Sequence, residues 1–281
     1  MLATLAALAA SASLRAQDEH TPAAGKPSTP KKLTEWPALD KTVRRRVRAL
    51  VKDFRKKPEL HGAAADKLVA IGAGAVPVLI PMVNDRPDGI NDQLFGVIDR
   101  LTGPPHAALL AREIRRPSVA LRRHLMRRFA TFHDPELAPV LTKALKDKDP
   151  EIAYYAALAL LGIGNLDGLD RVLDTARQRW SESRDLIAAV LPAARSRTTG
   201  NAVLERIALA KPTEQMAGLR LLRYLMVKDQ RVMLRHYLES SDFAVKREAI
   251  NCARVVHGEK PLEKLSSFQA INMAKEWLGK L

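Results

Sequence analysis

The sequence predicts an all-α protein, an α-solenoid of about seven helix pairs, and three observations support this fold class. Residues 149–174 have the pattern of two apolar helices joined by a glycine turn. The spacing of leucines and glycines from Leu158 onward recurs 90 residues earlier, from Leu68 onward, without a gap. Helix-start signals recur about every thirty residues between Pro58 and Ser241. A repeat of this length is typical of stacked helical units, which bury their apolar faces only against their neighbours.

The central unit begins at Asp149-Pro150. The carboxylate of an Asp at this position accepts hydrogen bonds from the free N–H groups of the first turn, and Pro suits the first helical position because no donor is needed there. Apolar residues then occupy both faces up to Leu161, and a helix that is apolar on all sides is buried. Gly162 and Gly164 end this helix, since glycine adopts left-handed conformations at little cost. A second helix with one apolar stripe follows.

These residues resemble HEAT repeats in their short form of about thirty residues, the phycobilisome-lyase-like type. The resemblance rests on the Asp-Pro helix starts at 134 and 149, on AALALLGIG at 156–164 and on KLVAIGAGAVPVLIPMV at 67–83. It covers about residues 59–257, and it implies a right-handed superhelix that serves as a binding surface. Two units depart from the pattern. The unit at 181–210 has Pro192 inside its expected first helix, and the unit at 212–239 lacks the glycine turn.

The first 38 residues differ in composition from the rest of the chain. Residues 1–17 contain an apolar run of small residues and the sequence Ala10-Ser11-Ala12, which predict a signal peptide and export to the periplasm or the extracellular space. The run is too short to span a membrane, no Lys or Arg precedes it, and the alternative is an alanine-rich tail. Residues 18–38 are rich in Pro and charges, which predicts a disordered linker. We expect Trp36 to hold the end of this linker against the first helix.

Residues 39–281 form the predicted array. Residues 39–57 are expected to form a basic capping helix with one apolar seam, because stacked units need a polar face at each end. The seven predicted pairs then cover residues 59–84, 88–115, 117–146, 149–178, 181–210, 212–239 and 241–280.

The chain carries a formal charge of +15 at pH 7, from 46 Lys and Arg against 31 Asp and Glu, which favours anionic partners. Two groups of basic residues are therefore candidate binding surfaces, one on the capping helix and one at the junction of the second and third pairs. They are Arg44, Arg45, Arg48 and Lys52 in the first group, and Arg115, Arg116, Arg122 and Arg123 in the second. Ordinary solvated helix faces would show the same pattern. Aromatic residues are not interleaved with the arginines, so stacking on single-stranded bases is not expected.

The sequence shows no catalytic, metal-ligating or cofactor-binding pattern. The seven histidines form no H-E-x-x-H pair and no zinc-type spacing with the single cysteine, Cys252. The G-x-G pairs at 72–74 and 162–164 follow predicted helices, whereas a dinucleotide site requires a strand. We therefore expect no catalytic residue, no metal and no cofactor. The alkylpurine DNA glycosylases built on HEAT-like repeats are also basic and of similar length, but no Trp/Asp motif of that family aligns here.

Three hypotheses on function follow from these observations. The first is a non-enzymatic scaffold outside the cytoplasm that presents a concave face to a protein partner. The second is a basic solenoid that binds an anionic polymer or surface, such as an acidic glycan, a lipid headgroup or a nucleic acid. The third is an enzyme. One contiguous positive surface would favour the second hypothesis, and scattered arginines would favour the first.

Overall fold

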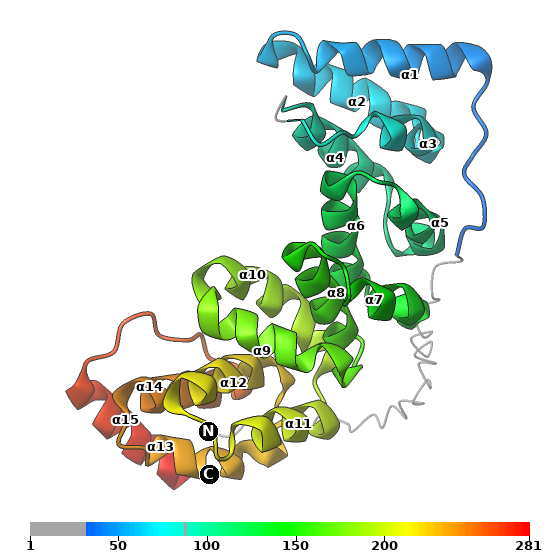
Figure 1. Ribbon diagram of the computed structural model, residues 1–281. Helices are drawn as coiled ribbons and strands as arrows, with labels where there is room; N and C mark the ends of the chain where they lie inside the picture. The colour runs from blue at the N-terminus through cyan, green and yellow to red at the C-terminus, as the bar shows by residue number, and fades with distance from the viewer. Residues whose placement is uncertain (1–31, 87–88) are drawn as a thin grey trace, which may run out of the picture. The chain divides into compact units, whose positions relative to one another are not determined.

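The computed structural model describes residues 32–86 and 89–281, and all regular elements in these ranges are helices (Figure 1). The predicted signal peptide and residues 18–31 of the predicted linker lie outside the described residues. Across the described part of the chain, 15 α-helices follow one another with short 3₁₀ helices between them and no β-strand. The predicted all-α solenoid is therefore confirmed.

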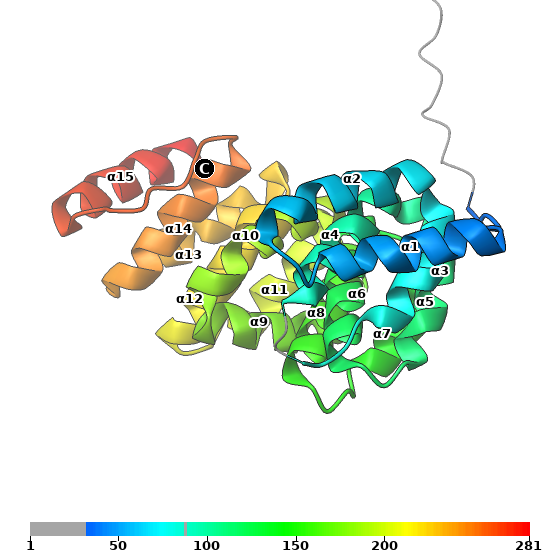
Figure 2. The same cartoon turned by 90° about the horizontal axis from the view of Figure 1, so that it is seen from above.

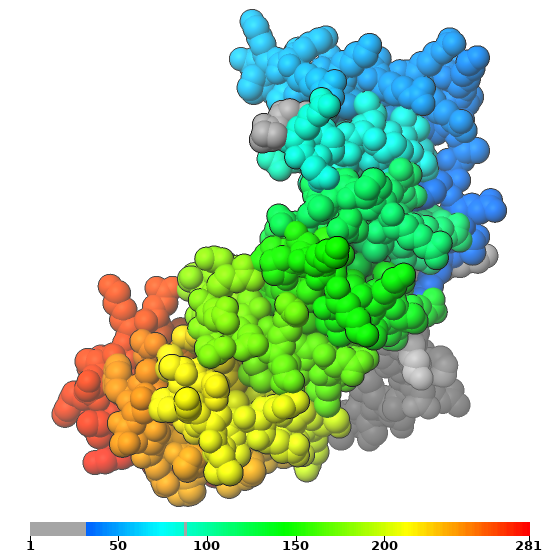
Figure 3. Space-filling view, viewed as in Figure 1, coloured from blue at the N-terminus to red at the C-terminus, as the bar shows by residue number. Residues whose placement is uncertain are grey.

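The helices form a capping helix, α1 (Lys41–Asp53), and the seven predicted pairs, and the second helix is the shorter one in all but the fifth and seventh pairs. The pairs are α2 (His61–Ile71) with α3 (Val76–Leu79), α4 (Ile90–Leu101) with α5 (Ala107–Arg112), α6 (Val119–Phe132) with α7 (Ala138–Ala144), α8 (Pro150–Gly162) with α9 (Leu169–Gln178), α10 (Trp180–Val190) with α11 (Arg197–Ile207), α12 (Pro212–Leu225) with α13 (Arg235–Leu238), and α14 (Phe243–Val256) with α15 (Ser267–Lys280). Figure 3 shows these pairs following one another in chain order.

The central helix α8 is buried on all sides, as its sequence predicts. Every residue from Ile152 to Gly162 is buried except Tyr155. The neighbours that cover the helix are α6, α7, α9 and the 3₁₀ turn after α10. Gly168, just before α9, lies so close to α8 that a Cβ atom added there would be 2.3 Å from the carbonyl oxygen of Ala157. The second helix of the pair therefore packs against the backbone of the first helix.

The capping helix α1 lies along α2 and against α3 (Figure 2). It was expected over residues 39–57 and is shorter at both ends. It begins after Asp40, whose carboxylate accepts a hydrogen bond of 2.8 Å from the backbone N–H of Val43. Val47 and Leu50 of the predicted apolar seam are buried, together with Val51, and the basic residues of the helix are exposed.

The fifth pair departs from the regular stacking. Pro192 was expected inside the first helix of this pair, but α10 ends at Val190 and Pro192 lies in a 3₁₀ turn, Leu191–Ala194. The reason is that Pro has no N–H group and its ring clashes with the carbonyl of the preceding turn. The ring Nε2 of His133, which has a left-handed backbone, donates a hydrogen bond of 2.9 Å to the carbonyl of Val190. With α10 ended early, α12 packs against this turn and against α9.

Residues 32–39, which we call the strap, lie extended against the array before α1 begins (Figure 1). The prediction of a disordered linker up to residue 38 is therefore wrong for residues 32–38. The backbone N–H of Leu33 donates a hydrogen bond of 2.9 Å to the carbonyl of Pro105. The ring of Trp36 stacks on His106, with 5.4 Å between ring centroids. A Pro-rich segment becomes ordered here because the array supplies a hydrogen bond and an apolar surface that the linker itself lacks.

The beginning of the strap reaches the third pair. The ammonium of Lys32 lies 2.9 Å from a carboxylate oxygen of Asp134 and 2.8 Å from one of Glu136. The strap thus contacts the start of the second helix in three successive pairs, at Gly74, at His106 and at Asp134.

Candidate binding surfaces

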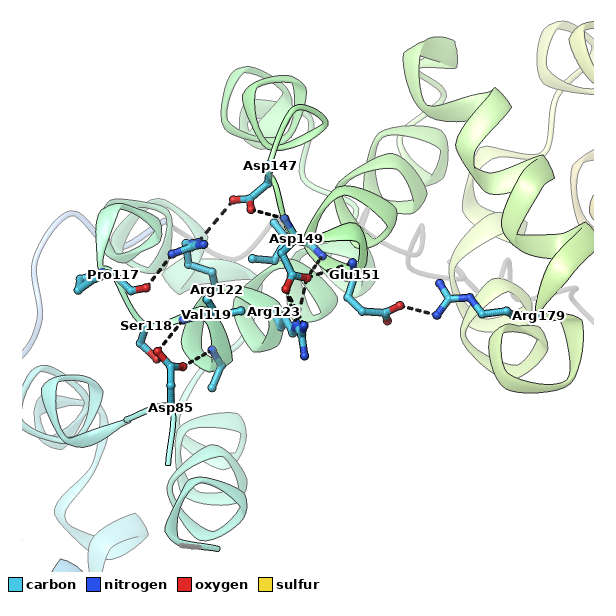
Figure 4. Close-up of polar contacts among 12 residues, drawn as sticks. Asp85, Pro117, Ser118, Val119, Arg122, Arg123, Asp147, Asp149, Glu151 and Arg179 are labelled. Atoms are coloured by element: carbon cyan, nitrogen blue, oxygen red, sulfur yellow. Dashed lines mark hydrogen bonds and ion pairs between the residues drawn. The ribbon is translucent and has the colours of Figure 1, made fainter. Parts of the chain in front are cut away.

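The start of the third pair is held by the carboxylate of Asp85, a residue between the first and second pairs. Asp85 accepts hydrogen bonds from the backbone N–H groups of Ala120 (2.8 Å) and Val119 (3.2 Å) and from the hydroxyl of Ser118 (3.0 Å) (Figure 4). These N–H groups belong to the first turn of α6, where no intrahelical acceptor exists. The hydrogen bond from Ala120 contributes most to holding the pKa of Asp85 below its ordinary value.

Two of the predicted junction arginines continue this pattern to the fourth pair. The guanidinium of Arg123 contacts both carboxylate oxygens of Asp149, the N-cap of α8, with its Nε at 2.9 and 3.0 Å (Figure 4). This contact lowers the pKa of Asp149 below its ordinary value. Arg122 donates to the carbonyl of Pro117 at 2.9 Å and lies 3.5 Å from a carboxylate oxygen of Asp147. Both arginines therefore tie α6 to the chain around it.

The other two junction arginines differ from each other. Arg116 forms an ion pair with Glu113 on the preceding turn. Arg115 is exposed and has no side-chain hydrogen bond or ion pair with the described residues. Of the four predicted residues, Arg122 and Arg123 are thus used in contacts that reach the fourth pair, and Arg116 is paired locally. A similar ion pair lies further along the array, where the guanidinium of Arg179, the residue after α9, binds Glu151 of α8 at 2.5 Å (Figure 4).

The basic residues of α1 differ from three of the four junction arginines in having no side-chain partner among the described residues. Arg44, Arg45, Arg48 and Lys52 are all exposed, and none of their side chains bonds to another described residue. Nine Lys and Arg lie between residues 41 and 57, while residues 40–57 contain only two carboxylates, those of Asp40 and Asp53. Asp40 accepts from the backbone of α1, and Asp53 is paired with Lys56. The capping helix therefore presents a surface of unneutralised positive charge, which is the arrangement that attracts anionic ligands.

Two of these arginines border a hollow of about 520 Å³ between the strap, α1 and α3, which we call the N-terminal hollow. Arg44 and Arg48 lie on its α1 side. The remaining lining is apolar and comes from the strap and from the second helix of the first pair. It includes Trp36, Pro37, Leu39, Pro77, Val78 and Met82. The sequence indicated the two charges, but it did not indicate the apolar wall beside them.

A second apolar hollow, of about 510 Å³, lies between α11 and the 3₁₀ turn that leads into α13, and we call it the C-terminal groove. Its lining includes Leu204 and Ala208 on one side and Met233 and Tyr237 on the other. Met233 is 54% exposed. The preceding residue, Val232, does not line the groove but is also exposed.

An ion-pair cluster that sequence reasoning missed lies between α12 and α14. Arg223 and Glu248 are 5% and 4% exposed and form an ion pair, and the Nε of Arg220 lies 3.4 Å from the same carboxylate. Both guanidiniums lie over the ring of Trp180, at 5.2 Å for Arg220 and 5.6 Å for Arg223. Burial lowers the pKa of Arg220. One sequence signal was available, because Glu248 lies at helical spacing from Val245 and Cys252, on an otherwise apolar face.

The described residues offer little for catalysis. They contain no group of three or more His, Cys, Asp or Glu side chains arranged to hold a metal ion. Cys252 is fully buried, and burial raises the pKa of its thiol to about 12. A thiol in this state is not a nucleophile at neutral pH.

The stacked helix pairs define a helical-repeat protein, and comparison with known families names the repeat. Residues 107–192, from α5 to the turn after α10, match the family model of HEAT repeats, so this segment is similar to HEAT repeats. The predicted resemblance is confirmed over this segment, and the assignment to the short form stays a prediction. No curated protein matches the sequence. In the part of the chain that the structure describes, no single helix has the length and apolar character to cross a membrane.

Proposed function

We propose that the protein is a non-enzymatic HEAT-repeat scaffold that binds a protein partner outside the cytoplasm. HEAT repeats generally serve protein–protein interaction, and their successive helices offer long binding surfaces. The observation that carries the proposal is the exposed apolar surface formed by the C-terminal groove with Val232 and Met233.

The C-terminal groove has the composition of a recognition surface. Contiguous apolar groups on a folded surface mark interaction sites, whereas isolated ones do not. Methionine adapts its shape to a partner because its side chain is unbranched and polarisable. Tyr237 and His236 beside it supply an aromatic ring and a polar edge. A partner helix or extended segment with apolar side chains fits this lining.

Site-specific cross-linking in the native host tests the proposal. A photoreactive amino acid at position 233 should give one discrete adduct of higher mass, because Met233 would lie within the interface. The same amino acid at Lys143, an exposed charged residue of α7, is the control. The absence of an adduct at 233, or the same set of adducts at both positions, would contradict the proposal.

Export is tested separately by the N-terminus of the protein isolated from its native host. We expect the mature chain to begin between Ser13 and Asp18, since the A-x-A pattern precedes this range. Mass spectrometry of the N-terminal peptide identifies the start. A cytoplasmic protein with intact Met1 would contradict export and leave the binding proposal unaffected.

The second candidate is binding of an anionic polymer, and the unneutralised surface of α1 favours it. Binding that neutralises a polyanion releases counterions, so affinity should fall steeply as salt rises. Retention on heparin across a salt gradient measures this. The test variant changes Arg44, Arg45, Arg48 and Lys52 to Gln, and the charge-matched control changes Lys143, Lys146, Lys148 and Lys264 to Gln. A much larger loss from the α1 set would locate the site there, and equal losses would show that only net charge matters.

A further inference from the structure

The apolar wall of the N-terminal hollow is held in place by contacts within the protein itself. A Cβ atom added to Gly74 would lie 2.6 Å from the carbonyl oxygen of Pro37 and 2.9 Å from a methyl group of Leu39. The strap therefore lies in direct contact with the start of the second helix, at a point where only glycine fits. Trp36 is held from behind by its stacking on His106. A wall fixed in this way binds a ligand without first paying the entropy of its own ordering.

The charge of the hollow lies entirely on one side. Arg44 and Arg48 are four residues apart on α1, so their side chains leave the same face of the helix. None of the residues that line the hollow is acidic. The nearest carboxylates in the sequence are those of Glu35, which is not a lining residue, and Asp40, which already accepts from the backbone of α1. Two guanidiniums next to an apolar wall thus have no anion among the described residues.

We propose that the N-terminal hollow binds an extended acidic segment of the protein partner, with one large apolar side chain against Trp36 and its flanking carboxylates on Arg44 and Arg48. The volume of about 520 Å³ lies within the usual range of ligand pockets, about 300–1,000 Å³, and holds an aromatic side chain with its backbone. Guanidinium–carboxylate pairs are among the strongest hydrogen bonds in proteins, and they orient the segment along α1. This inference rests on the proposed function, because it names the chemistry of the protein partner.

The apolar wall is the reason to choose a peptide over a polysaccharide. A sulfated glycan satisfies the arginines but offers only the small C–H faces of its sugar rings to Trp36, Val78 and Met82. A glycan would therefore leave the larger part of the lining in contact with water. An acidic peptide with an aromatic residue covers both parts of the hollow.

Fluorescence anisotropy with two labelled polymers of equal length tests the proposal on the full chain. One polymer is poly-glutamate, and the other is a random copolymer of glutamate and tyrosine. We expect the copolymer to bind about tenfold more tightly or better, since a buried aromatic ring contributes at least that factor. Equal affinity for the two polymers, or equally tight binding of heparin, would overturn the proposal. Either result would mean that the basic residues bind polyanions without using the apolar hollow.

Matched variants locate the site. Arg44→Gln with Arg48→Gln should weaken copolymer binding about tenfold or more, because both charge pairs are lost. Arg45→Gln with Arg46→Gln removes the same charge from the same helix but from residues that do not line the hollow, so it should have a much smaller effect. Equal losses in the two double variants would refute the site. Circular dichroism confirms that each variant is folded.

A third variant separates the apolar contact from the charges. Trp36→Ala should abolish the preference for the copolymer while poly-glutamate binding changes less than twofold, and an unchanged preference would overturn the role of Trp36. The outcome is also distinguishable from failure of the proposed function. If a partner is captured through Met233 but the Arg44 and Arg48 variant retains copolymer binding, this inference fails and the scaffold function stands.

Discussion

Glu248→Gln changes a single side-chain atom, and we expect it to lower the free energy of unfolding strongly. The carboxylate of Glu248 is buried between α12 and α14, where it faces the guanidiniums of Arg223 and Arg220. Their side chains are 6% and 12% exposed. The amide keeps the shape of the side chain but removes its charge, so two buried cations lose the one anion that the described residues place beside them.

The magnitude follows from this geometry. Removing one partner of a buried ion pair costs about 3–5 kcal/mol, because the remaining charge has neither water nor a counter-ion. Here the guanidinium of Arg220 keeps its hydrogen bond of 2.8 Å to the carbonyl of Ala176. Both guanidiniums also keep their contact with the ring of Trp180. We therefore expect the lower end of the range, about 3 kcal/mol.

Urea denaturation followed by circular dichroism measures the loss of unfolding free energy. Hydrogen exchange shows where the loss occurs, since repeat arrays can unfold in parts. We expect faster exchange in α12 and α14 than elsewhere. The control is Asp229→Asn, whose partner Arg197 lies 2.8 Å away with both side chains 70% exposed, and it should cost less than about 0.5 kcal/mol. A loss below about 1 kcal/mol for Glu248→Gln would refute the reasoning from burial.

Three further substitutions test the packing of the central pair, each by urea denaturation. Leu160→Ala, at a fully buried position of α8, should cost about 2–5 kcal/mol, and a loss under about 0.5 kcal/mol would mean that α8 is not central. Asp149→Asn should cost about 1 kcal/mol at pH 7. Because Arg123 holds the pKa of Asp149 below its ordinary 3.8, the stabilisation is complete above that pH and is lost as the pH falls through the lowered pKa. A difference between wild type and variant that persists unchanged at pH 2 would contradict this. Gly168→Ala should cost about 1–3 kcal/mol, because the added Cβ would collide with α8. The control Gly62→Ala should be neutral or stabilising, since no atom lies within 4 Å of its added Cβ. Equal effects of the two substitutions would contradict the close approach of Gly168 to α8.

The site was only partly predictable from the sequence. The positive charge of α1 could be read directly, because residues 40–57 contain only two carboxylates. The apolar wall of the N-terminal hollow could not be read, since it depends on the path of the strap. Trp36 was expected to hold the linker against the first helix. It does line the hollow that α1 borders, but it stacks on His106 of the second pair, 70 residues along the chain.

The junction arginines show the limit of sequence reasoning most clearly. Arg122 and Arg123 look in sequence like the arginines of α1, and both groups were equal candidates for an anionic ligand. Their difference arises from what lies opposite them. Asp147 and Asp149 come within reach only because α6 packs along α8, whereas no carboxylate of the described residues pairs with the arginines of α1.

The sequence by itself determined the helix pairs, their number and the burial of α8, because these depend on local signals: capping residues, glycine turns and apolar spacing within one or two turns. The tertiary structure decided the ordering of the strap and the pairing of Arg223 with Glu248. Each of these depends on a surface that another pair supplies. A charge or an extended segment has no fixed environment along the chain, and its partner is known only when neighbouring pairs are packed together.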